Sequence, residues 1–105
     1  MADVERRFGE AMLAIYRDAK GIGYTPSIFL RMLHEKGAIQ TARQLINAPQ
    51  PSDGYTRLWE LKRLDLSVEA VVHDNAEWHK LFTENELSLC KRRLSEYGYF
   101  ETGKR

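Results

Sequence analysis

The sequence predicts an all-α fold, a compact bundle of five to six short helices. Apolar residues recur at helical spacing in most segments, and residues that favour helix starts or ends separate these segments. The one valine-rich segment that could form a strand has no second strand to pair with. With 105 residues, the chain is long enough to bury one core. We therefore expect a single helical domain over residues 1–105, with flexible ends at 1–3 and 101–105.

A glycine-containing turn separates the first two predicted helices. An apolar stripe from Val4 to Ala19 predicts an amphipathic first helix that ends at Gly21–Gly23. Thr25 is expected to cap the second helix, with Pro26 in its first position. Apolar residues surround most of this second helix, so we expect it to be the central and most buried element. They are Ile28, Phe29, Leu30, Met32 and Leu33.

Glycine and proline mark the boundaries of the third and fourth predicted helices. Gly37 is expected to take a left-handed conformation that ends the second helix. The third helix ends before Pro49 and Pro51, because proline cannot continue a helix. Ser52 is expected to cap the fourth helix, which breaks near Leu64–Asp65. The third helix carries the apolar residues Ala38, Ile39, Ala42, Leu45 and Ile46, and the fourth carries Tyr55, Leu58, Trp59 and Leu61.

Two further helices are predicted in the last third of the chain. Ser67 is expected to cap a short fifth helix, and Asn75 to end it. Although this segment holds three valines, Glu69–Ala70 interrupt strict alternation, which favours helix over strand. Thr83–Glu86 match a capping box, the start of a last helix that stops at Gly98. A single turn anchored by Trp78, Leu81 and Phe82 is expected between these two helices.

The overall charge and composition limit the classes of partner. Sixteen Lys and Arg against fifteen Asp and Glu give a net charge of +1, so nucleic acid or anionic lipid would require a local basic patch. The sequence has neither the apolar run of a signal peptide nor one of membrane-spanning length. A single cysteine suits a reducing compartment. We expect a cytoplasmic protein that does not associate with membranes.

Part of the second half resembles a known group of sequences. Residues 54–70, GYTRLWELKRLDLSVEA, together with 81–84 and 97–99, resemble a family of small uncharacterised bacterial helical proteins. The resemblance covers about half of the chain. It implies a bacterial origin and carries over no activity, cofactor or catalytic residue.

The sequence lacks the motifs that organise common catalytic sites. There is no Gly-x-Ser-x-Gly, no phosphate-binding glycine loop and no His-Glu-x-x-His. His73 and Glu77 are four residues apart and could share a helix face, with His79 nearby as a third zinc ligand. Asn75 is expected to break that helix, which favours a hydrated connection. We therefore expect no metal, no cofactor and no enzymatic activity.

Two further side chains, Cys90 and His34, are of types that can take part in catalysis. Cys90 lies between Leu87 and Leu94 on the predicted core stripe of the last helix, which favours a buried thiol over a catalytic one. His34 lies near the end of the second helix, where a surface position is expected.

Nucleic acid is the alternative partner that the sequence suggests. The second and third helices, joined at Gly37, could form a helix-turn-helix, with the third presenting polar side chains to the major groove. Lys91–Arg93 are basic, but consecutive helical residues lie about 100° apart and point in three directions. The balanced charge also disfavours phosphate binding. The candidate contact residues are Gln40, Arg43, Gln44, Lys91 and Arg92.

Another protein is the favoured partner. The second half is rich in aromatic residues and arginine, the residue types that dominate interface energetics. Trp59, Arg63 and Trp78 are the predicted contact residues, and a core of this size is expected to leave one of the two indoles partly exposed. Tyr99 and Phe100 are expected to fold back onto the bundle. The sequence thus predicts a non-enzymatic interaction module that binds another protein in the bacterial cytoplasm, with self-association left open.

Overall fold

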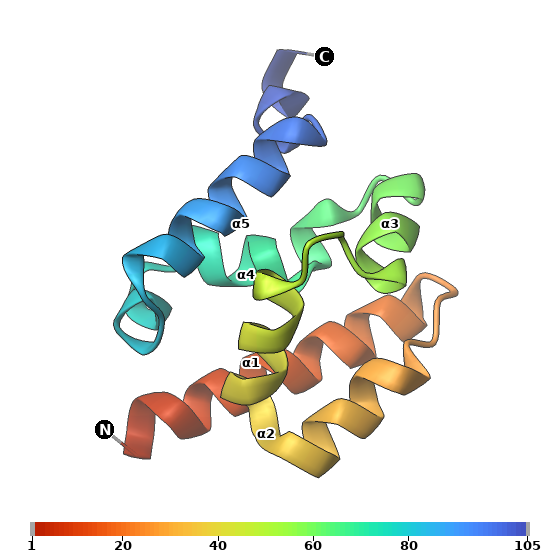
Figure 1. Cartoon of the computed structure of the whole chain (residues 1–105). Helices are drawn as coiled ribbons and strands as arrows, with labels where there is room; N and C mark the ends of the chain where they lie inside the picture. Colours follow the sequence, from red (N-terminus) through yellow and green to blue (C-terminus); the bar gives the residue numbers. More distant parts are fainter. Residues whose placement is uncertain (1, 105) are drawn as a thin grey trace.

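The protein is an all-α bundle, as the sequence predicts. A computed structural model describes residues 2–104, and the side chains of residues 3–101, and it contains no strand in that range. The expected flexibility of Met1 and Arg105 lies outside the described residues. The α-helices are α1 (Ala2–Gly21), α2 (Ser27–Asn47), α3 (Asp53–Glu60), α4 (Val68–Asp74) and α5 (Glu84–Glu96), and the 3-10 helices are η1 (Leu64–Leu66), η2 (Ala76–Leu81) and η3 (Tyr99–Lys104) (Figure 1).

Helix α4 lies at the centre of the bundle and is the most buried element. It packs against α1, α2 and α5, which surround it in Figure 1. On the α1 side, Phe8 is fully buried and makes edge contacts with Trp78, at 5.4 Å between ring centroids, and with Phe82, at 5.6 Å. Such aromatic contacts stabilise a core beyond the area they bury. The main core therefore joins α1, α2, α4 and α5 through one continuous apolar cluster.

The polar residues at the start of α4 explain why its valines form a helix. The Ser67 hydroxyl accepts a hydrogen bond from the Ala70 amide at 3.1 Å and donates one to the Leu64 carbonyl at 2.7 Å. Ser67 thus caps α4 and fixes η1 in front of it. Asn75 ends the helix and caps η2, because its side chain accepts a hydrogen bond from the Glu77 amide. Both predicted boundaries are confirmed.

The capping box at the start of α5 also connects this helix to α2. Glu86 accepts a hydrogen bond from the Thr83 amide at 3.0 Å, and the Thr83 hydroxyl accepts one from the Glu86 amide at 3.1 Å. The other carboxylate oxygen of Glu86 accepts hydrogen bonds from Arg43, at 2.9 Å, and Asn47, at 2.8 Å. Burial opposes ionisation of Glu86, but these hydrogen bonds outweigh it and lower the pKa.

Two expectations about the start of α2 are wrong. Thr25 does not cap the helix: Pro26 occupies the N-cap position, and the Thr25 carbonyl instead accepts a hydrogen bond from the Ser27 amide at 2.9 Å. The first half of α2 is also not the most buried element, since it has no buried residue and Ile28 is 68% exposed. The reason is its position at the edge of the bundle, where it packs beside α1 (Figure 1) and leaves much of its apolar surface uncovered.

Gly37 divides α2 into the two helices that the sequence predicts. Its φ of 83° confirms the expected positive φ, while its ψ of 169° places it in a backbone region that is essentially restricted to glycine. In a regular helix, a threonine hydroxyl can donate to the carbonyl four residues earlier. For Thr41 that carbonyl belongs to Gly37, whose ψ turns it out of the helical direction. The buried Thr41 hydroxyl consequently has no hydrogen-bond partner among the described residues.

We expect Gly37→Ala to destabilise the protein by about 1–3 kcal/mol, because alanine must adopt a backbone conformation that it strongly disfavours. Gly9→Ala is the matched control. Gly9 lies inside α1 with open space around its Cβ position, so alanine should raise stability by roughly 0.5–1 kcal/mol. Urea unfolding of both variants measures the effects, and stabilisation by Gly37→Ala would contradict the assignment.

We expect Thr41→Val to raise the free energy of unfolding by about 1–2 kcal/mol, because it replaces a buried, unpaired hydroxyl by a methyl group of similar size. Thr41→Ser keeps the hydroxyl and should not stabilise. Thermal unfolding of the two variants is the measurement, and a lower midpoint for Thr41→Val would show that the hydroxyl has a partner.

Candidate functional site

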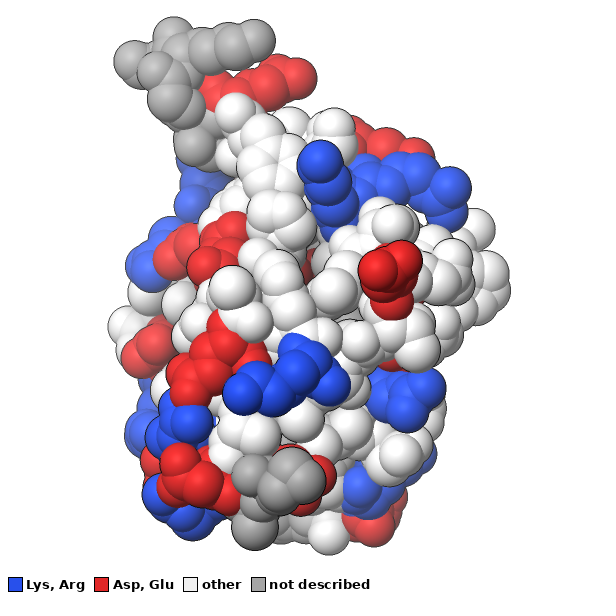
Figure 2. Space-filling view, turned by 90° about the vertical axis from the view of Figure 1, so that its left-hand side faces the viewer, with Lys and Arg blue, Asp and Glu red and all other residues white. Residues whose placement is uncertain are grey.

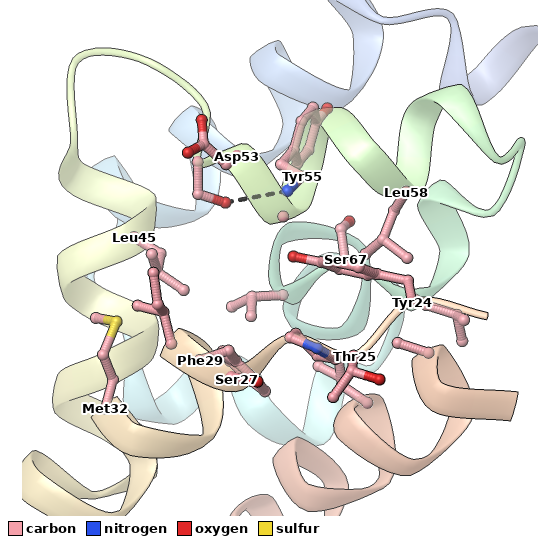
Figure 3. A pocket seen from close by; sticks show the side chains of 18 of the residues that line it. Tyr24, Thr25, Ser27, Phe29, Met32, Leu45, Asp53, Tyr55, Leu58 and Ser67 are labelled. Atoms are coloured by element: carbon pink, nitrogen blue, oxygen red, sulfur yellow. Dashed lines mark hydrogen bonds between the residues drawn. The ribbon is translucent and has the colours of Figure 1, made fainter. Parts of the chain in front are cut away.

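The main candidate site is an apolar cavity at the open edge of the bundle. It has a volume of about 420 Å³ and lies between the end of α1, both halves of α2, α3 and the start of α4. Figure 3 shows Met32 and Leu45 on one side and Tyr24 and Leu58 on the other. This volume lies in the range of ligand-binding pockets, roughly 300–1,000 Å³.

The turn after α1 positions Tyr24 over the cavity. The Tyr24 amide bonds to the Ala19 carbonyl at 2.9 Å, and Gly23 has a φ of 93°, which lets the chain reverse at this point. The Tyr24 hydroxyl lies against Gly54 so closely that a Cβ there would be only 3.1 Å away. Burial, and then the charge of Asp53, raise the pKa of Tyr24. The phenol therefore links the α1–α2 turn to α3 and forms one wall.

The cap of α3 forms the opposite edge of the cavity. The Ser52 hydroxyl accepts a hydrogen bond from the Tyr55 amide at 3.1 Å, as the sequence predicts (Figure 3). This cap leaves Asp53 exposed at the cavity mouth and turns Tyr55 and Leu58 inward. The polar groups at the mouth are thus few and surround a mainly apolar interior.

The two buried polar side chains that line the cavity are already engaged. Ser67 caps α4, and the Glu69 carboxylate, 3% exposed, bonds to Arg93 at 3.0 Å. Burial raises the pKa of Glu69, although the hydrogen bonds to its own amide and to Arg93 act in the opposite direction. This arrangement favours the binding of an apolar group in the cavity over acid–base chemistry.

Arg93 holds two walls of the cavity in place. Its guanidinium donates to Glu69, to the Leu45 carbonyl at 3.2 Å and to the Ala48 carbonyl at 2.7 Å. Leu45 and Glu69 themselves line the cavity. In the sequence, Arg93 stands out only as part of the basic run Lys91–Arg93. Its spacing from Cys90 and Leu94 placed it beside the core stripe, and that signal could have identified it as an inward-facing residue.

The structure does not bring the predicted protein-binding residues Trp59, Arg63 and Trp78 together. Trp59 is 46% exposed on α3, whereas Trp78 is 6% exposed and packs in the core, so one indole is exposed as predicted. Trp78 cannot contribute its ring to the same surface, because Phe8 and the Arg7 guanidinium cover it. Arg63 forms a bidentate pair with Asp65 at 3.0 and 3.1 Å.

The predicted nucleic-acid residues lie on two helices. On α2, Arg43 is held by Glu86, and Gln44 accepts a hydrogen bond from Lys36 at 2.8 Å, while Gln40 is exposed. On α5, Lys91 and Arg92 are exposed and Arg93 points inward, so the three basic residues do point in different directions. On the face shown in Figure 2, acidic and basic side chains alternate rather than forming one basic patch. The nucleic-acid alternative stays a prediction.

The remaining candidates for chemistry do not form a site within the described residues. Asn75 separates His73 from Glu77, and residues 2–104 contain no cluster of three His, Cys, Asp or Glu that could hold a metal. Cys90 is fully buried, as expected, and burial raises the pKa of its thiol to about 12. His34 is exposed on α2.

Comparison with known proteins places the chain in no family. Neither protein-family models, nor curated proteins, nor solved structures give a match to the chain. Among the described residues, no helix combines the length and apolar character needed to span a membrane. A function must therefore be inferred from the residues of the site itself.

We expect Arg93→Met to reduce stability by about 3–5 kcal/mol at neutral pH, because it leaves the buried Glu69 carboxylate without its cation. The folded-state pKa of Glu69 lies above its unfolded value, so its protonated form favours folding and its ionised form opposes it. The loss of stability caused by Arg93→Met should therefore become smaller as the pH falls into the range in which carboxyl groups are protonated. Urea unfolding of wild type and variant between neutral and acidic pH tests this.

The exposed neighbour offers a matched control, since Arg92→Met should change stability by less than about 0.5 kcal/mol. A loss for Arg93→Met that stays constant across this pH range would contradict the role assigned to Glu69.

Proposed function

We propose that the protein is a non-enzymatic interaction module that binds another protein by accepting apolar side chains of that partner in the cavity. The observation that carries this proposal is an open, mainly apolar cavity whose rim continues onto the exposed side chain of Ile28. The proposed setting is the bacterial cytoplasm, where the one cysteine, buried as Cys90, would stay reduced.

The continuation of apolar surface beyond the cavity supports a protein partner over a small molecule. A small ligand is enclosed by its pocket, whereas Ile28, which lines the cavity at its rim, is 68% exposed. An amphipathic helix could insert one or two apolar residues and cover Ile28 with the next turn, as in other helix-in-groove complexes. A basic residue beside those anchors would pair with Asp53 at the cavity mouth.

The first half of α2 is suited to this role because the free protein folds while the apolar side chains of this half are partly exposed. Its apolar side chains are partly uncovered in the free protein, so a partner would bury them without displacing core residues. The partly buried residues Phe29 and Met32 line the cavity, with Ile28 at the exposed end. Size-exclusion chromatography during the test distinguishes a different protein from a second copy of the chain, because a second copy would make the chain elute as a dimer.

We expect Ile28→Asp to abolish selection of amphipathic helical peptides from a displayed library, because a carboxylate at the rim would be desolvated on binding. Wild-type protein should select peptides with apolar residues at positions i and i+3 or i+4. Leu13→Asp is the control, since Leu13 is also an exposed apolar residue of a helix but does not line the cavity. Equal selection by wild type and Ile28→Asp would refute the proposal.

A further inference from the structure

A second concave surface lies on the other side of α3 from the cavity. We call it the aromatic groove. It runs between the end of α3, η1, the end of α4 and the segment after α5. Its aromatic residues are Trp59, Tyr97, Tyr99 and Phe100.

The aromatic rings of the groove meet at steep angles. Trp59 and Tyr97 lie 5.4 Å apart with their planes at 88°, so that they form a corner, and Tyr99 and Phe100 lie 5.3 Å apart at 70°. Trp59 and Phe100 are each 46% exposed. Tyr99 has folded back, as expected, because its hydroxyl donates to Asp74. Rings that meet at such angles present several π faces to one point, which suits a cation.

The charges around the groove are complementary to a cation. Three of its lining residues are acidic, Glu60, Asp65 and Asp74, and one is basic, Lys62. Glu60 and Asp65 are paired with arginines. Asp74 instead contacts His73 at 2.9 Å and accepts from the neutral Tyr99, and no Lys or Arg of the described part of the chain pairs with it. The Asp74 carboxylate can therefore accept a further hydrogen bond from a cation bound beside the rings.

We propose that the aromatic groove binds an arginine side chain presented by a protein partner. The guanidinium lies against the rings of Trp59 and Tyr97 and pairs with the carboxylate of Asp74. Arginine fits this site better than lysine, because its planar guanidinium stacks on aromatic faces and is more weakly hydrated. The Asp74 carboxylate would repel a phosphate or carboxylate placed against the rings, which argues against an anionic ligand.

This inference rests on the proposed function only in taking a protein as the source of the arginine. The groove and the cavity are lined by different residues: α3 contributes Trp59 and Glu60 to the groove, and Asp53, Gly54, Tyr55 and Leu58 to the cavity. Binding at each can therefore be removed separately, and the failure of one proposal leaves the other standing.

The test is an NMR titration of the full chain with a short Gly-Arg-Gly-Arg-Gly peptide. The matched control peptide carries citrulline, a neutral isostere of arginine, and a third peptide carries lysine. The indole N–H of Trp59 should shift with the arginine peptide, while that of the buried Trp78 serves as an internal reference. The affinity should fall as salt rises, since the groove is open to solvent.

Two variants should weaken the binding of the arginine peptide by about tenfold or more, a loss of about 1.4 kcal/mol in binding free energy. Trp59→Ala removes one wall of the corner, and Asp74→Asn removes the charge while keeping an acceptor for Tyr99. Ile28→Asp should leave this binding unchanged, because Ile28 lies at the cavity. Equal binding of the citrulline or lysine peptide, or no shift at Trp59, would overturn the proposal.

Discussion

The hydrogen bonds of the Arg93 guanidinium hold together three helices of the core, α2, α4 and α5. The last carbonyls of a helix have no partner within that helix, and Arg93 on α5 donates to two at the end of α2. The same group neutralises Glu69 on α4, a carboxylate that could not stay ionised there alone. One side chain therefore donates hydrogen bonds to the carbonyls at a helix end and neutralises a buried carboxylate. Tyr55 adds α3 to this junction, because its hydroxyl donates to the Arg93 carbonyl at 3.1 Å.

This junction also fixes part of the cavity wall. Leu45 on α2 and Glu69 on α4 line the cavity, and both bond to the same guanidinium. Since that group is planar and rigid, Leu45 and Glu69 cannot shift relative to one another without breaking these hydrogen bonds.

Local signals predicted the helices well, and tertiary contacts explain what they missed. The caps Ser52, Ser67 and Thr83 and the positive φ of Gly37 depend on residues within one turn, so the sequence contains them in full. The exposure of α2 before Gly37, the inward position of Arg93 and the burial of Trp78 depend on which elements adjoin. Of the predicted protein-binding residues, Trp59 lines the aromatic groove and Arg63 lies near it. The sequence did not predict the cavity.

The kink at Gly37 gives the two halves of α2 different evolutionary freedom. The second half supplies Thr41, Ala42 and Ile46 to the core, so few substitutions there would be compatible with folding. The first half has no fully buried residue, and its side chains mainly shape the opening at the surface. Mutations at the exposed positions of that half can therefore accumulate with little effect on folding, whereas Phe29 and Leu33 pack against the core. Related chains could keep one scaffold and diverge in what they recognise by changing a single ten-residue segment, residues 27–36.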